Sequence, residues 1–349
     1  MRQRKHGRRQ EENEVGSVTI QHSSLESQAM STPAVAAHPT DAQGHAPTEL
    51  QKAASPSVRA VGPGLLLAVL GAVAFSGKAI IVKLAYRHGV DAVTLIMFRM
   101  LFALPLFVAL AWWTGRGKAA LTQRDVLAVL GLGFCGYYLA SYLDFAGLQY
   151  ISASLERLIL YLNPTLVLLL GVTVFGKPVT RRQLLALAVS YAGVMVVFVH
   201  EVSLVGPHTA LGAALVLGSA LSYAVYLSYS GQEVSRLGAL RLAGWATSVA
   251  CCLCILQFVV LRPMSAFNVA PEVIALSIVN ATLCTFAPVL MVMMAIERIG
   301  ATLTAQTGLV GPLSTILMGV FILGEPFTVW IAAGTVLVLT GVWLLAKWR

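Results

Sequence analysis

Long apolar runs, each bounded by charged residues, Gly or Pro, follow one another along the chain from about residue 60 onward. Runs of about 18 to 24 residues are long enough to cross the hydrocarbon core of a bilayer as α-helices. The pattern predicts an all-α integral membrane protein. Its ten expected transmembrane helices lie near residues 64–84, 92–112, 126–148, 152–174, 182–199, 210–229, 243–261, 272–295, 302–323 and 328–346.

The second half of this apolar region repeats the first. The stretch 150–197 recurs at 298–345 with a constant shift of 148 residues, and the matched positions include Pro164 and Pro312. Internal duplication with Pro or Gly interruptions at matched depths is typical of secondary transporters. Each copy holds an odd number of helices, so the second copy must enter the membrane from the opposite face. The sequence therefore predicts two inverted five-helix repeats, residues 64–199 and 210–347.

Residues 1–60 have a different character. They are rich in Gln, Ser, His, Pro and charged residues, and no apolar stretch there buries enough surface to offset the conformational entropy of folding. We therefore predict a disordered cytoplasmic tail. Either this tail contacts anionic lipid or it is simply a solvated segment.

The composition narrows the class of protein. Hydrophobic residues make up 57% of the chain and charged residues only 11%, which excludes an ordinary aqueous surface. The net charge of +9 does not indicate nucleic-acid binding, because most basic residues lie in the tail or flank apolar runs. The five cysteines lie within apolar runs and form no CxxC pair, which indicates packing rather than redox or metal chemistry.

Lys and Arg in the short connections predict the orientation. If the N-terminus is cytoplasmic, the outer helix ends hold only Lys83, Arg87, Arg157 and Arg262. The inner connections and the C-terminus hold Arg116, Lys118, Arg124, Lys177, Arg181, Arg182, Arg236, Arg241, Arg298, Lys347 and Arg349. Because cytoplasmic loops carry the excess of basic residues, both termini are predicted to be cytoplasmic.

A short turn connects the last two helices of each repeat. It reads Gly-Lys-Pro at 176–178 and Gly-Glu-Pro at 324–326, the preceding helix carries Pro in both copies, and Arg99 lies in the second helix. Over residues 64–346 these features resemble the EamA-type branch of the drug/metabolite transporter superfamily, although Lys177 stands where Glu is usual. The resemblance implies ten helices around a central cavity and transport without ATP hydrolysis. It favours export, and it leaves the substrate open among amino acids, other metabolites, nucleotide sugars and drugs.

Five ionisable residues interrupt the helices of the first repeat. Lys78, Arg99, Asp144, Glu156 and Arg157 lie about 6 to 10 Å below the predicted outer interface, a common depth at which they could meet. Each costs at least ~2.5 kcal/mol in hydrocarbon, so pairing, water or a function is required. Their equivalents in the second repeat are uncharged: Tyr226, Thr247, Val292, Thr304 and Ala305. We predict an asymmetric polar cluster whose excess cation favours a carboxylate or phosphate on the ligand.

Each of these residues has a plainer interpretation. Lys78 either binds the ligand or extends its amine to the interface, and Arg99 either binds the ligand or holds its helix through Asp144 or backbone carbonyls. Asp144 lies near a wetted helix end, and either Glu156 or Arg157 could mark the start of a helix. Asp144 or Glu156 is the expected proton carrier if transport is coupled to protons.

Uncharged polar residues extend the candidate site. Tyr137, Ser141 and Asp144 share one helix face, as do Tyr223 and Tyr226, and tyrosine suits either a cavity wall or an interfacial belt. The breaks at Asn163-Pro164 and Gly311-Pro312 either form a mid-membrane site or kink the helices for packing. Each Pro frees a carbonyl four residues earlier, at Leu160 and Gly308, for presentation inward. Gln306 is the most conspicuous polar residue of the ninth predicted helix.

The sequence as a whole favours a secondary transporter of the bacterial inner membrane that moves a small organic metabolite by alternating access. Its expected partners are that substrate, protons, membrane lipid and, in a homodimer, a second copy of the chain; no cofactor, metal or nucleic acid is expected. A membrane enzyme acting on a lipid-like substrate is an alternative, but the short loops contain no catalytic motif. A membrane sensor that uses the basic tail is another.

Overall fold

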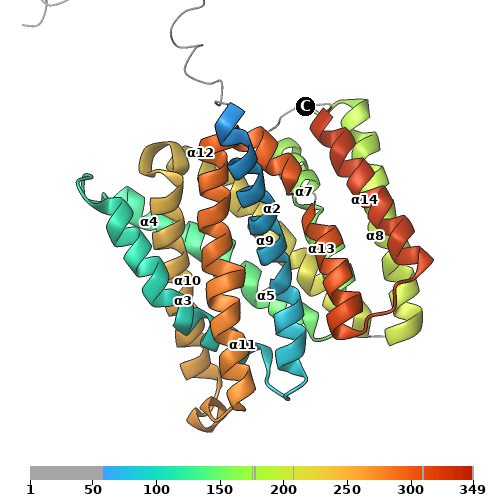
Figure 1. Ribbon diagram of the computed structural model, residues 1–349, viewed down its shortest axis with the longest axis horizontal. Coiled ribbons are helices and arrows are strands. Elements are labelled where there is room, and N and C mark those ends of the chain that lie inside the picture. The colour runs from blue at the N-terminus through green and yellow to red at the C-terminus, as the bar shows by residue number, and fades with distance from the viewer. Residues whose placement is uncertain (1–57, 175, 177, 207, 309, 348–349) are drawn as a thin grey trace, which may run out of the picture. The chain divides into compact units, whose positions relative to one another are not determined.

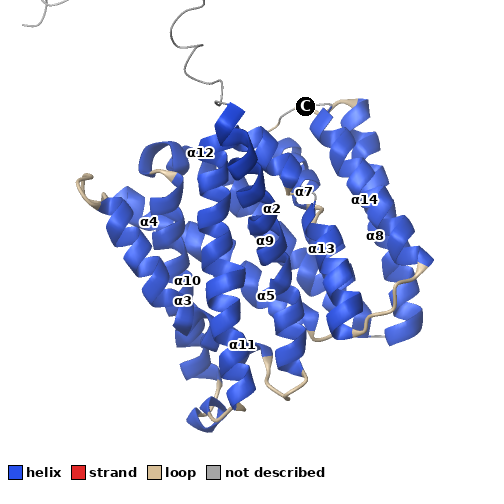
Figure 2. Cartoon of the chain, viewed as in Figure 1, coloured by secondary structure: helices blue, strands red, loops and turns tan. Residues whose placement is uncertain are grey.

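The computed structural model describes residues 58–347 except 175, 177, 207 and 309, and these belong to one unit, Pro56–Arg349. The predicted disordered tail falls almost wholly outside the described residues. Within the described part all regular structure is helical (Figure 2). The all-α membrane fold predicted from the sequence is thereby confirmed.

The first repeat is made of helices that follow the predicted apolar runs (Figure 1). In chain order they are α2 (Val58–Tyr86), α3 (Ala92–Gly115), α4 (Gln123–Gly133), the π-helical turn η1 (Phe134–Leu139), α5 (Ala140–Leu148), α6 (Ala153–Leu160), α7 (Asn163–Thr173) and α8 (Arg181–Val205). α4, η1 and α5 form one continuous span, 123–148, and α6 with α7 forms another, 153–173, broken at Tyr161 and Leu162.

The second repeat follows the same order. Its elements are α9 (His208–Leu237), α10 (Ala239–Leu261), the 3-10 turn η2 (Met264–Phe267), α11 (Pro271–Ala281), the π-helical turn η3 (Thr282–Phe286), α12 (Ala287–Thr307), α13 (Val310–Met318), η4 (Gly319–Leu323) and α14 (Val329–Lys347). One predicted boundary is wrong. Residues 302–307, expected to open the ninth membrane helix, belong to α12, and the ninth helix is the shorter apolar segment Val310–Leu323.

Polar residues at the ends of the apolar runs start the helices. Asp91 accepts hydrogen bonds from the backbone of Val93 and Thr94 and so caps α3. Thr122 caps α4, where Asp125 completes a reciprocal capping box. Such caps satisfy the first free N–H groups of a helix, which explains why the helices begin where the apolar runs do.

Contacts between the repeats come in equivalent pairs. Gly64 of α2 packs against Ile299 of α12, and the residues 148 positions away, Gly212 of α9 and Ile151, pack against each other in the same way. The π-helical turns η1 and η3 also start at equivalent positions, 134 and 282. The sequence repeat is therefore a repeat of structure and of packing.

Equivalent helices pack on one another in opposite directions. Along α3 and α10, Gly244 lies on Ala111 at one end while Arg262 meets Asp91 at the other. α8 and α14, side by side in Figure 1, are likewise antiparallel, with Gly193 on Gly334. A helix that packs antiparallel to its own copy is the relation expected of inverted repeats.

The two ends of the bundle are named here by their connections. The α2–α3 end holds residues 87–91, the α5–α6 connection 149–152 and the turn 324–328, which are joined by contacts such as that of Arg87 with the Leu323 carbonyl. The α3–α4 end holds residues 116–122 and the start of α10, joined by Arg241 and the Ala119 carbonyl.

Candidate functional site

Three charged residues of the first repeat meet inside the bundle. Lys78 of α2 donates to Oδ2 of Asp144 on α5 at 2.5 Å, and its Nζ lies 3.5 Å from Oε1 of Glu156 on α6. All three are buried, and Glu156 is 0% exposed. The contacts predicted from common helix depth are present, and they exclude the alternative that Lys78 extends to the interface.

Arg157 joins this cluster and connects it to the second repeat. Its Nε donates to the Thr315 hydroxyl of α13 at 2.9 Å, and its Nη2 donates to the Phe75 carbonyl of α2 at 3.3 Å. Its Nε lies 4.0 Å from Oε2 of Glu156. A guanidinium offers five N–H donors, so Arg157 holds the two repeats together while it faces a carboxylate.

Arg99 lies farther from the carboxylates than was expected. Its Nε donates to the Thr285 hydroxyl in η3 at 3.1 Å, and its guanidinium lies 5.1 Å from the ring centre of Phe145. The expected anchors were Asp144 or backbone carbonyls, but the observed one is a side-chain hydroxyl. Nη1 of Arg99 is buried and has no hydrogen-bond partner among the described residues, as is also true of Oδ1 of Asp144. Nη1 of Arg99 can therefore donate a further hydrogen bond, and Oδ1 of Asp144 can accept one.

The charges of the cluster do not balance. Lys78, Arg99 and Arg157 are cationic in their usual ionisation states, whereas only Asp144 and Glu156 are anionic. All five are less than a tenth exposed. Buried charge is costly unless it is paired, and among these five side chains the cations outnumber the carboxylates by one.

The break between α6 and α7 does not present free carbonyls. Nδ2 of Asn163 donates to the Leu160 carbonyl at 2.7 Å, and the Tyr161 hydroxyl donates to the Gly308 carbonyl. The prediction that Leu160 and Gly308 direct oxygens into a cavity is therefore wrong, because neighbouring side chains satisfy both. Asn163 stabilises the break, which sets the direction of α6 and of Glu156.

The tyrosines form a separate cluster. The hydroxyls of Tyr137 in η1 and Tyr226 in α9 are 3.2 Å apart, and Tyr223 stacks on Tyr226. Tyr137 precedes Asp144 by seven residues on one span, about 10 Å along the axis. Tyr226 is the equivalent of Lys78, so in the inverted repeat it lies toward the α3–α4 end. These residues pack α9 against η1 and do not contact the charges described above.

Two other predicted site residues take no observed part in the cluster. Ser141 is half-buried on α5, between the tyrosines and Asp144. Gln306 belongs to α12, but its side chain lies outside the described residues. The role of both in binding stays a prediction.

Two carboxylates at the α2–α3 end make contacts that sequence reasoning did not predict: Glu325 was noted only as part of a turn, and Glu201 was not noted. Glu325, in the turn before α14, accepts from the Ala153 N–H at 2.8 Å and from the Ser154 hydroxyl at 2.9 Å. Glu201 of α8 accepts from the N–H and the hydroxyl of Ser152. The sequence held one indication of these contacts. Ser152 caps α6, but the third residue of α6, Leu155, is not the Glu or Gln that would complete a capping box.

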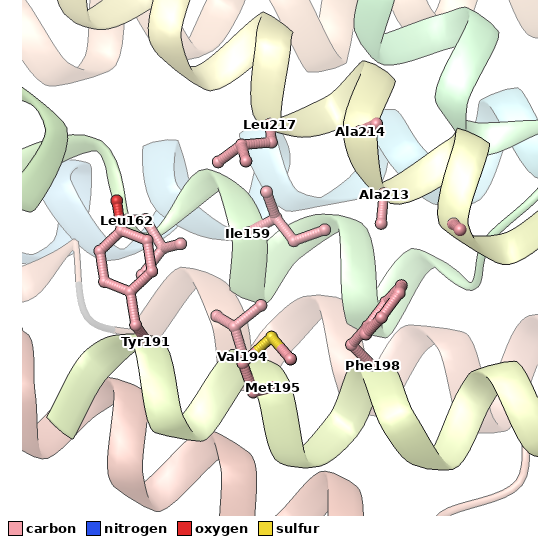
Figure 3. A pocket seen from close by; sticks show the side chains of 10 residues that line it. Ile159, Leu162, Tyr191, Val194, Met195, Phe198, Ala213, Ala214 and Leu217 are labelled. Atoms are coloured by element: carbon pink, nitrogen blue, oxygen red, sulfur yellow. The ribbon is translucent and has the colours of Figure 1, made fainter. Parts of the chain in front are cut away.

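A pocket of about 220 Å³ lies between α6, α8 and α9. In Figure 3, Ile159 of α6 lies between Val194 of α8 and Leu217 of α9. Apart from Tyr191, its lining is wholly apolar, so it suits hydrocarbon rather than a polar ligand. A second pocket, of about 270 Å³, lies at the α2–α3 end beside Asp91 and Arg262. Neither pocket includes the five charges.

Within the described residues, nine helices are long and apolar enough to span a bilayer, and a shorter apolar helix, Val310–Leu323, joins them. Two repeats whose equivalent helices pack antiparallel, with ionisable groups buried between membrane-length helices, are typical of membrane transporters.

Comparison with known proteins agrees with this class. A model of the EamA-like transporter family matches residues 62–199 and 210–347, so the chain belongs to that family. It is a multi-pass membrane transporter and not an enzyme, as expected from the sequence.

Two similar proteins are also named as transporters. The chain is 29% identical to the uncharacterized transporter YcbK of Bacillus subtilis over 77% of this chain and 88% of that protein. It is 24% identical to an uncharacterized transporter of Archaeoglobus fulgidus over 80% of this chain and 96% of that one. A crystal structure with 17% identity shares the fold at a TM-score of 0.56, over 82% of this chain and 97% of the other.

Proposed function

We propose that the protein exports a small organic anion, such as a carboxylate-bearing metabolite, across the bacterial inner membrane by alternating access of its two repeats. The observation that carries this proposal is a set of five buried charged side chains in one repeat only, in which the cations outnumber the carboxylates: Lys78, Arg99, Arg157, Asp144 and Glu156. A ligand binds in one orientation, so the residues that bind it need not recur at the equivalent positions of the second repeat.

Lys78 is the proposed partner of the ligand's negative charge. In the structure its amine is held by Asp144 and approached by Glu156. A proton on either carboxylate removes one competitor for the amine and lets a ligand carboxylate take its place. Ligand and proton then cross together.

This coupling also bears on direction. One anion and one proton carry no net charge, so their movement follows the ligand gradient and the pH gradient rather than the membrane potential. Export then takes place when the outward gradient of the ligand exceeds the inward proton gradient that opposes it. Positive charge at the α3–α4 end supports an orientation in which both termini are cytoplasmic.

Transport into proteoliposomes tests the proposal. A thermal-shift screen of metabolites on purified protein first identifies ligands, and each carboxylate is compared with its uncharged amide. We expect stabilisation by the carboxylate alone and uptake that depends on the pH gradient. Replacing Asp144 with Asn or Glu156 with Gln should abolish that dependence in one case, whereas Glu272→Gln, at the exposed start of α11, should retain it. Equal binding of the amides, or pH dependence that persists in both carboxylate variants, would contradict the proposal.

A further inference from the structure

Two carboxylates from distant parts of the chain hold the beginning of α6. Glu325 receives hydrogen bonds from the Ala153 and Ser154 N–H groups and from the Ser154 hydroxyl. Glu201 receives them from Ser152. The N-terminus of a helix carries free N–H groups and partial positive charge, so it attracts carboxylates. Here both carboxylates lie outside α6, one of them in the other repeat.

The backbone of the 324–328 turn is shaped for this contact. Gly324 has a φ of 74°, a conformation that favours glycine, and the Glu325 N–H donates to the Gly319 carbonyl at 3.0 Å. A side chain on Gly319 would press on the Glu325 carboxylate, since a Cβ there would lie 2.8 Å from its Oε2. The turn therefore folds Glu325 back toward α6.

Cations close the same end from the side of α2. Nζ of Lys83 donates to the Ile151 carbonyl at 2.8 Å, and Nη2 of Arg87 donates to the Leu323 carbonyl at 2.7 Å. Through these bonds α2 is tied to the α5–α6 connection and to η4. Four charged side chains thus hold α2, α6, α8 and η4 together at the α2–α3 end: Lys83, Arg87, Glu201 and Glu325.

The inverted repeat cannot build the same network at the opposite end. The equivalent of Lys83 is Gly231, which has no side chain. The equivalent of Glu325 is Lys177, a cation, which lies outside the described residues. Because the scaffold is duplicated and these residues are not, the network is a feature of one face and not a requirement of the fold.

We propose that Glu325 and Glu201 form a carboxylate gate, in which their contacts with residues 152–154 keep the α2–α3 end closed. The gate acts on the candidate site directly, because α6 carries Glu156 and Arg157 within its first five residues. Opening of this end requires α6 to leave the two carboxylates, which moves Glu156 relative to Lys78. Glu325 and Glu201 are thus positioning residues, and this role rests on the proposed function because opening is a step of transport.

Distance measurement between two spin labels tests the gate without a substrate. The labels are placed at Gln149, beside α6, and Phe327, beside Glu325, both of which are exposed. The five native cysteines, Cys135, Cys251, Cys252, Cys254 and Cys284, are first replaced by alanine. We expect a single short distance in this background and an added population of longer distances with Glu325→Gln. An amide is uncharged and has one acceptor oxygen, whereas the carboxylate accepts from Ala153 on one oxygen and from Ser154 on the other.

Lys177→Gln provides the matched control, because it changes the equivalent residue of the other repeat. It should leave the distance between the labels unchanged. A Glu325→Gln distribution identical to that of the unmodified gate overturns the proposal. If that variant does not fold, Glu201→Gln is measured with the same labels and is held to the same outcome.

A cross-link separates the gate from the transport hypothesis. Ser154→Cys and Glu325→Cys, joined by a short reducible cross-linker, should block transport of the ligand found above, and reduction should restore it. Full transport by the cross-linked protein overturns the gate. Longer label distances in Glu325→Gln, together with failure of every anion tested as substrate, would leave the gate standing and remove the proposed function instead.

Discussion

At the residue scale, Lys78 is the cation that two buried carboxylates share, and its removal leaves Asp144 without its ion-pair partner and Glu156 with Arg157 alone. We expect Lys78→Met to destabilise the protein by about 3 to 5 kcal/mol, the usual cost of breaking a buried ion pair from one side. The double variant Lys78→Met/Asp144→Asn should recover much of this loss, because one of the stranded charges is gone. Thermal unfolding in one detergent measures both. Transport should be absent from both variants, and a single variant as stable as the wild type would show that the cluster is hydrated.

Asp91 gives a stability that depends on pH at the surface of the α2–α3 end. Burial alone would raise the pKa of Asp91, but hydrogen bonds from Thr94 and Arg262 outweigh it and hold the pKa below its usual value. The contribution is therefore complete above the unfolded pKa, near 4, and is lost as pH falls through the lower folded pKa. Asp91→Asn keeps the helix cap and removes the charge.

Melting temperatures of wild type and Asp91→Asn, measured from pH 7 to pH 3, test this expectation. The wild type should be more stable at neutral pH by less than about 1 kcal/mol, since both side chains of the Asp91–Arg262 pair are more than a third exposed. The difference should vanish at the acid end. A constant difference across the range would mean that Asp91 acts only as a cap.

The sequence predicted which charged residues lie close together, but it did not predict all of their hydrogen-bond partners. Counting residues from helix ends placed Lys78, Asp144 and Glu156 at one depth, and depth decides whether groups on neighbouring helices can meet. It could not identify Thr285 as the partner of Arg99, because the pair is separated by 186 residues and depends on how η3 packs against α3. For the same reason the sequence could not show that Tyr137, Tyr223 and Tyr226 pack against one another, since spacing along a helix gives a face but not the neighbour of that face.

At the scale of elements, α8 and α14 approach until their backbones touch. A Cβ on Gly193 would lie 2.7 Å from the Gly334 carbonyl oxygen, which cannot move aside as a flexible side chain could. Close approach through small residues stabilises helix pairs in membranes. We expect Gly193→Ala to lower stability by about 1 to 3 kcal/mol, the usual cost of overpacking.

Gly131→Ala is the control for that substitution. Gly131 lies in α4, where an added Cβ meets nothing within 4 Å, so alanine should stabilise the helix by about 0.5 to 1 kcal/mol. Thermal unfolding of the two variants should thus shift in opposite directions. Equal shifts would mean that α8 and α14 separate without cost.

Hydropathy located the helices but not their irregularities. The π-helical turns η1 and η3 lie within apolar runs and differ from an α-helix only in hydrogen-bond spacing, which composition does not encode. The boundary between α12 and α13 was missed because residues 298–310 contain no charge beyond Arg298 to end a run. The turns at Gly176 and Gly324 could be predicted from the sequence because both positions have positive φ angles, which favour glycine.

At the scale of the whole molecule, the sequence repeat predicted that equivalent positions of the two halves would make equivalent contacts. One shift of 148 residues relates Gly64 and Ile299 to Gly212 and Ile151, so equal sequences form equal contacts. What the overlay could not predict is where equal positions have different roles. Lys83 and Glu325 close one end, whereas Gly231 and Lys177 stand at the equivalent positions of the other, and only the structure shows what the first pair contacts.

The inverted topology predicted from the sequence can be tested by its placement of two equivalent turns in the membrane. Val179 and Phe327 are equivalent residues in the two Gly-x-Pro turns, and an inverted pair must place them on opposite faces of the bilayer. With the native cysteines replaced, Phe327→Cys should react with a membrane-impermeant thiol reagent added to whole cells. Val179→Cys should react only after the membrane is opened, because the basic residues of its turn are held in the cytoplasm. Reaction of both from outside would show that equivalent ends face the same way, and alternating access would then need a different axis.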